Sequence, residues 1–124
     1  MLKQSEKIPL QFINFIKKYW LLITLAALTL ITILSLTPLP QLPSVPGSDK
    51  AHHFIAYATL FFPVALAKPK YLIWIGLLFA CWSGAIELIQ PHVNRYGEWL
   101  DMLANSIGLL CGFLLAWLTN KFVR

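Results

Sequence analysis

The sequence predicts an all-α protein, a four-helix transmembrane bundle oriented N-in/C-in with an outward-facing polar cluster. Three observations lead to this fold class. Hydrophobic residues make up 58% of the 124 positions and charged residues only 12%, which is too apolar for an ordinary soluble domain. Four long apolar runs alternate with short polar breaks, as in multi-pass membrane proteins. Basic residues are also divided very unequally between the two ends of those runs.

The apolar runs define the expected organisation of the chain. Residues 1–18 form a basic segment, and membrane spans are expected at about residues 19–36, 51–67, 71–90 and 98–118. The stretch 37–48 (TPLPQLPSVPGS) predicts an extended connector, because its four prolines are incompatible with a regular helix. We therefore expect one membrane domain at 19–124, preceded by a cytoplasmic segment at 1–18.

The positions of the basic residues predict the orientation. Four spans place the N-terminus, the turn at 68–70 and the C-terminus on one side of the membrane. That side holds eight of the ten basic residues, namely Lys3, Lys7, Lys17, Lys18, Lys68, Lys70, Lys121 and Arg124. The other side holds Lys50 and Arg95. The positive-inside rule then places both termini in the cytoplasm, so the net charge of +5 reflects topology and no nucleic-acid partner is expected.

Polar and ionisable side chains gather at the opposite, outer ends of the last three spans. They are Asp49, Lys50, His53, Tyr57, Glu87, Gln90, Arg95, Glu98, Asp101 and Asn105. Such groups are costly when they face lipid, so they usually turn toward the bundle or toward water. Short connectors make adjacent spans antiparallel and bring these ends to one depth. We therefore expect these residues to form a single ligand-binding site.

Small residues predict which faces of the spans pack together. Gly76 and Ser83 share a side of the third run with Glu87. In the fourth run, Gly108 and Gly112 lie within about 60° of Asp101 on a helix of 3.6 residues per turn. Small residues at this spacing allow close approach of helices. Gly108 and Gly112 are therefore expected to be helix-packing positions that turn the polar side chains inward.

Four motifs in this order resemble the VanZ-like family: Asp49-Lys50-x-x-His53-Phe54-x-Ala56-Tyr57, Glu87-x-x-Gln90, Arg95, and Asp101-x-x-x-Asn105-x-x-Gly108-x-x-x-Gly112. The resemblance covers the last three spans. It implies a small multi-pass protein of the bacterial cytoplasmic (inner) membrane that is associated with the cell envelope. The family is named for a protein linked to teicoplanin resistance, which implies an influence on tolerance to glycopeptide-type antibiotics. The resemblance implies no mechanism, cofactor or oligomeric state.

Two interpretations of the polar cluster involve no reaction. In the first, Arg95 pairs with neighbouring carboxylates, and Gln90 and Asn105 bond between spans, so the cluster only holds a structural helix bundle together. In the second, the cluster binds a lipid-linked cell-wall precursor or a glycopeptide beside membrane lipid. Arg95, Lys50 and His53 would then hold a phosphate, and the carboxylates would meet amines or hydroxyls.

The third interpretation is an intramembrane enzyme that acts on a lipid-linked phosphate or sugar. A histidine with several carboxylates can perform acid–base chemistry or hold a divalent metal. The candidate residues are His53, Glu87 and Asp101, with Asp49 as the group that orients the histidine. The spacing matches no established metal signature, so the sequence assigns no metal site and no cofactor. Our preferred interpretation is ligand binding.

Overall fold

A computed structural model describes residues 3–38, 49–93 and 99–122 of the chain. Five α-helices and one short 3₁₀-helix make up almost all of these residues, which contain no β-strand, so the expected all-α class is confirmed. The elements are α1 (Gln4–Lys18), α2 (Trp20–Leu36), α3 (Asp49–Ala67), α4 (Leu72–Ile89), η2 (Gln90–Val93) and α5 (Trp99–Phe122). The ends of α2, α3, α4 and α5 lie close to those of the four predicted spans.

Not every helix could cross a membrane by its length and hydropathy alone. Among the described residues, Leu72–Val93 and Trp99–Phe122 are long and apolar enough. The pair α1 and α2 also qualifies when taken together, although the two helices are bent by 73° relative to each other. Two or at most three spans therefore follow from these criteria. The α3 helix begins with Lys50, His52 and His53, which lowers its hydropathy.

The first helix is an element that the sequence did not predict. Residues 1–18 were expected only to be a basic segment, yet Gln4–Lys18 forms α1, with Pro9 inside it. Ile13 of α1 is buried and belongs to the hydrophobic core. The apolar residues of this segment are interspersed with lysines, so the sequence shows no long apolar run here. The segment nevertheless forms a helix that packs against α3.

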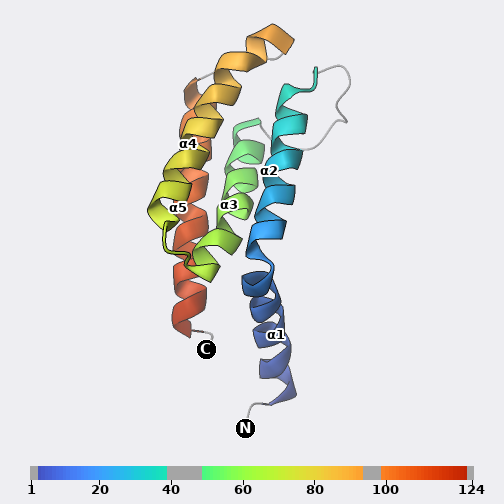
Figure 1. The fold of residues 1–124 in the computed structure, drawn as a ribbon, viewed down its shortest axis with the longest axis vertical. Helices are drawn as coiled ribbons and strands as arrows, with labels where there is room; N and C mark the ends of the chain where they lie inside the picture. Colours follow the sequence, from blue (N-terminus) through green and yellow to red (C-terminus); the bar gives the residue numbers. More distant parts are fainter. Residues whose placement is uncertain (1–2, 39–48, 94–98, 123–124) are drawn as a thin grey trace.

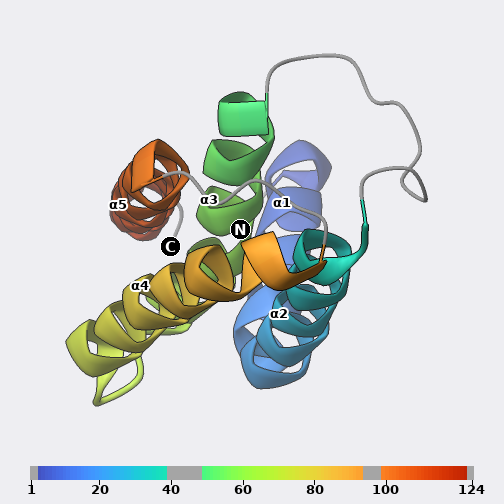
Figure 2. The ribbon, with the colours of Figure 1, turned by 90° about the horizontal axis from the view of Figure 1, so that it is seen from above.

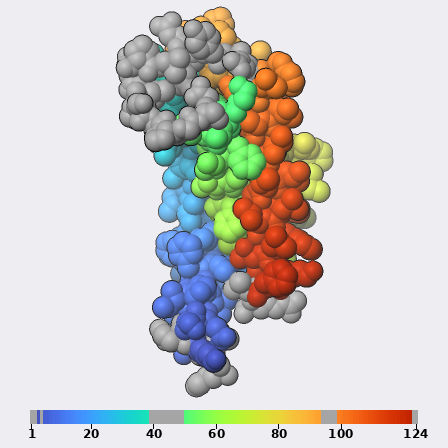
Figure 3. All heavy atoms as spheres, turned by 180° about the vertical axis from the view of Figure 1, so that it is seen from behind, coloured from blue at the N-terminus to red at the C-terminus, as the bar shows by residue number. Residues whose placement is uncertain are grey.

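The core of the protein is built around α3. Tyr57, Leu60 and Val64 are almost fully buried. Viewed from above, α3 lies between α5 and α1, with α4 and α2 along its other side (Figure 2). From behind, only a narrow strip of α3 is visible between α5 and the blue α1 and α2 (Figure 3). This central position explains why a helix with a polar beginning can sit inside an apolar protein.

The outward surfaces of the surrounding helices are apolar. Leu22 on α2, and Ile73 and Leu88 on α4, are all more than two-thirds exposed. Extended apolar surface of this kind is rare on soluble monomers and is suited to contact with lipid.

The most extensive contact between described helices joins α3 to α5. A Cβ atom added at Gly108 would collide with the carbonyl oxygen of Phe54, and one added at Gly112 would lie 2.5 Å from the carbonyl oxygen of Ala58. Both obstacles are backbone atoms, which cannot rotate away as a side chain can. The two helices run in the same direction (Figure 1). Their backbones touch at these glycines.

Candidate functional site

Polar side chains from several helices meet at one end of the molecule. The end of α2, the start of α3, the end of α4 with η2, and the start of α5 all lie there, opposite both chain termini (Figure 1). Five buried polar residues belong to this end or lie one turn below it: Ser35, Ser83, Gln90, Asp101 and Asn105. The antiparallel arrangement of successive helices brings together residues up to about fifty positions apart.

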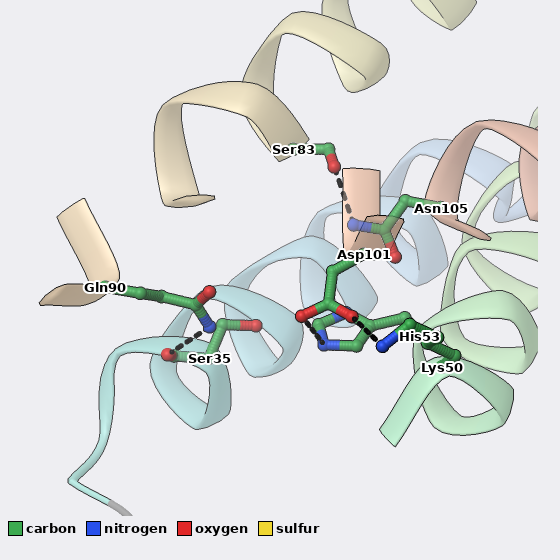
Figure 4. A network of polar contacts seen from close by, with 7 residues as sticks. All are labelled: Ser35, Lys50, His53, Ser83, Gln90, Asp101 and Asn105. Atoms are coloured by element: carbon green, nitrogen blue, oxygen red, sulfur yellow. Dashed lines mark hydrogen bonds and ion pairs between the residues drawn. The ribbon is translucent and has the colours of Figure 1, made fainter. Parts of the chain in front are cut away.

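Asp101 is the central charged residue of the described cluster. It lies in the first turn of α5, where the helix dipole favours a negative charge, and only 6% of its surface is exposed. Its Oδ1 atom lies 3.7 Å from Lys50 Nζ, and its Oδ2 atom lies 3.7 Å from His53 Nε2 (Figure 4). Both partners come from the first turns of α3. These distances allow electrostatic attraction but are longer than direct hydrogen bonds.

Glu87 joins this group from α4. One carboxylate oxygen of Glu87, one of Asp101 and a ring nitrogen of His53 all lie within 4.8 Å of one another. The Oε1 atom of Glu87 is buried. Three different helices therefore place an imidazole and two carboxylates around one point, an arrangement that suits proton transfer or cation binding.

A buried hydrogen bond lies directly beneath this group. Asn105 Nδ2 donates to Ser83 Oγ at 2.6 Å, which joins α5 to α4 (Figure 4). The Tyr57 hydroxyl also interacts with the Ser83 side chain, and its ring is almost fully buried. Among the described residues, Asn105 Oδ1 finds no hydrogen-bond partner, although the residue is only 2% exposed.

Gln90 lies to one side of the carboxylates and makes a different contact. Its Nε2 atom donates to the backbone oxygen of Ser35 at 3.1 Å, which ties η2 to the end of α2. A second hydrogen bond joins α4 to α2 and runs from Trp82 Nε1 to Thr32 Oγ1 at 2.9 Å. The structural interpretation expected Gln90 to bond between spans, but neither acceptor was foreseen, because backbone oxygens and single hydroxyls carry no recognisable pattern.

Three of the expected site residues cannot be placed. Arg95 and Glu98 lie outside the described residues, as does the side chain of Asp49, whose backbone begins α3. Of the other seven, Lys50, His53, Glu87 and Asp101 converge, Tyr57 and Asn105 lie next to them, and Gln90 bonds to α2.

Comparison with known proteins places the chain in a family. The VanZ/LLP1 family model matches residues 2–120. The chain belongs to the VanZ/LLP1 family. The match includes α1 as well as the motif-bearing helices, so the VanZ/LLP1 region extends further toward the N-terminus than the motifs alone indicated. Neither the curated proteins nor the solved structures contain a match to this VanZ/LLP1 chain.

Proposed function

We propose that this chain is a four-span protein of the bacterial cytoplasmic membrane, with both termini in the cytoplasm and the polar cluster facing outward. The eight-to-two division of basic residues supports this orientation. The start of α1 and the end of α5 lie at the end of the molecule opposite the cluster, which agrees with this orientation (Figure 1). The central position of α3 supports its inclusion as a span, since its neighbours cover most of its surface.

The proposed function is binding of a lipid-linked, phosphate-bearing envelope ligand at the outer cluster. The observation that carries this proposal is the pairing of Lys50 and His53 around Asp101. The Lys50 side chain is 46% exposed while that of Asp101 is only 9% exposed, so an accessible ammonium group lies next to a buried carboxylate. A cation in this position can meet a phosphate at the membrane surface, while the carboxylates meet amine or hydroxyl groups. Through such a ligand the protein would influence tolerance to glycopeptide-type antibiotics.

The test compares a polyprenyl phosphate with the uncharged polyprenol of the same chain length. Binding to the purified protein in detergent is measured by fluorescence competition or native mass spectrometry. We expect the phosphate to bind more tightly than the alcohol, and Lys50→Gln to weaken phosphate binding about tenfold, the usual effect of losing one charged hydrogen bond. Lys70→Gln is the matched control, because Lys70 is an exposed lysine in the turn before α4. Equal binding of alcohol and phosphate, or equal loss in both variants, would contradict the proposal.

A second function is favoured by the convergence of His53 with Glu87 and Asp101. An imidazole next to two carboxylates can move a proton to or from a reacting phosphate or sugar. Release of phosphate from a polyprenyl diphosphate by the wild-type protein, lost in His53→Gln, would assign enzymatic activity. Ligand binding without turnover would assign a binding protein.

A further inference from the structure

His53, Glu87 and Asp101 have the composition of a metal-binding site. Each residue offers one ligand atom, and these atoms lie within 4.8 Å of one another. We propose that these three side chains, supplied by α3, α4 and α5, bind one divalent first-row transition-metal cation of the Mn²⁺ or Zn²⁺ type. The inference goes beyond the proposed function, since the metal can bind whether or not a lipid phosphate does.

The separation of the ligand atoms suits a single ion after a small contraction. Metal–ligand bonds of about 2.0–2.2 Å place opposite ligands about 4.2 Å apart and adjacent ligands about 3 Å apart. From a separation of up to 4.8 Å, two adjacent ligand atoms need to approach each other by up to about 1.8 Å, which is about one ångström of movement for each atom. The backbone contacts of Gly108 and Gly112 with α3 fix the two helices that carry His53 and Asp101. Side-chain rotation can supply the remaining movement.

A second observation points independently to a ligand at this place. Asn105 is 2% exposed, and its Oδ1 atom has no hydrogen-bond partner among the described residues. Its Nδ2 atom is directed to Ser83, while its oxygen points to the side on which Asp101 and His53 lie (Figure 4). A buried amide oxygen without a partner is costly, and a cation or a cation-bound water would satisfy it.

The charges around the cluster are consistent with an exchangeable cation. Two carboxylates converge beneath the membrane surface, where uncompensated charge is costly. In the structure, Lys50 supplies one compensating charge at 3.7 Å from Asp101, and its side chain is 46% exposed. A divalent ion between the carboxylates would replace Lys50, whose ammonium group can move into the surrounding water.

The set of ligand types selects the class of metal. Imidazole suits zinc and other first-row transition metals, whereas carboxylates also suit manganese. A site with one histidine and two carboxylates differs from the all-oxygen sites that calcium and magnesium prefer. Three protein ligands leave coordination positions open for water or for an oxygen of a bound ligand.

The experiment measures binding of Mn²⁺ or Zn²⁺ alone to the full-length protein. The protein is purified in detergent, freed of any histidine tag and stripped of metal, and then titrated in a calorimeter. We expect one ion per chain and a rise in the thermal unfolding midpoint on adding metal. His53→Gln and Glu87→Gln should each weaken binding more than tenfold. His92→Gln and Glu6→Gln, which change exposed residues of the same two types, should bind as the wild type does.

Lys50→Gln gives the test a result of opposite sign. Removal of a positive charge next to Asp101 should tighten metal binding several-fold, whereas the same change should weaken binding of a polyprenyl phosphate. Failure of the metal site and failure of the proposed function are therefore distinguishable. The proposal would be overturned if His53→Gln and Glu87→Gln bind metal as tightly as the wild type. It would also be overturned if the wild type binds no more metal than an unrelated membrane protein in the same detergent. Circular dichroism at matched detergent concentration verifies that each variant is folded.

Discussion

Asn105 donates a hydrogen bond of 2.6 Å from Nδ2 to the hydroxyl oxygen of Ser83, and both residues are almost fully buried. The bond joins α5 to α4 one turn below Asp101 and Glu87, respectively. It therefore fixes the spacing of the two helices that carry the carboxylates. The free energy that such a contact usually contributes to the stability of a membrane protein gives the first prediction.

Asn105→Leu should destabilise the protein by about 0.6–2 kcal/mol, because it removes the bond and leaves the Ser83 hydroxyl with one partner fewer. The measurement is the free energy of unfolding in detergent. Ser106→Ala is the control, since its hydroxyl bonds to the Met102 carbonyl within α5 itself. If the two substitutions have the same effect, the bond between helices has no special role in stability.

Gly108→Ala should destabilise the protein by about 1–3 kcal/mol, as is usual for overpacking of a rigid contact. The added methyl group would meet the backbone of Phe54, which cannot move without shifting α3. Gly76→Ala is a matched control, because its methyl group would lie 3.2 Å from the ring of Phe61, a side chain that can rotate. Thermal stability of the three proteins decides the matter. Equal stability of Gly108→Ala and wild type would show that the helices adjust freely.

His53 and Asp101 should be energetically coupled. A double-mutant cycle with His53→Ala and Asp101→Asn is expected to give a coupling energy of about 0.5–3 kcal/mol in unfolding. Asn120→Ala provides the control pair with His53→Ala, because Asn120 bonds to the Leu66 carbonyl at the other end of the molecule. Effects in the control pair should add to within about 0.5 kcal/mol. Additivity in both pairs would remove the single-site interpretation.

The conservative changes Glu87→Gln and Asp101→Asn separate a functional cluster from a structural one. We expect both variants to remain folded and to lose binding of metal or of a polyprenyl phosphate, because the carboxylate charge is removed while the shape is kept. The readouts are ligand affinity and the unfolding midpoint, measured on the same preparations. Lower stability with unchanged affinity would assign the cluster to holding the helices together.

The orientation can be tested with cysteine labelling of intact cells. In a background of Cys81→Ser and Cys111→Ser, we expect Val45→Cys and Asn94→Cys to react with an impermeant reagent, because the sequence around these two positions contains few basic residues. Lys70→Cys should react only after the membrane is permeabilised. Labelling of Lys70→Cys in intact cells, with Asn94→Cys protected, would invert the proposed topology.

The sequence allowed prediction of the helices with long apolar runs, because such runs have few alternative structures. It did not allow prediction of α1, whose lysines conceal an apolar face that reaches the core through Ile13. The short connectors between spans predicted that Glu87 and Asp101 lie at one depth. The structure brings these two residues together with His53.

The finer contacts needed the three-dimensional arrangement. Ser83 was noted only as a small residue, yet its hydroxyl is the acceptor for Asn105. Likewise, Gly108 and Gly112 indicated close packing but not the helix they would touch, since the partner atoms belong to the backbone of Phe54 and Ala58. Backbone atoms are the same in every residue, so a sequence carries no direct sign of them.

The contact of the two glycines with α3 also limits how the site can change shape. Gly108 and Gly112 are one helical turn apart, and so are Phe54 and Ala58, whose backbones they touch. A slide of α5 along α3 by a fraction of a turn would place larger side chains against that backbone. A slide by a whole turn, about 5.4 Å, would bring Ala104 or Ala116 to one of these contacts, where a Cβ atom collides with the α3 backbone. Asp101 and His53 therefore keep one axial register, and the site cannot open by a gradual slide of α5 along α3.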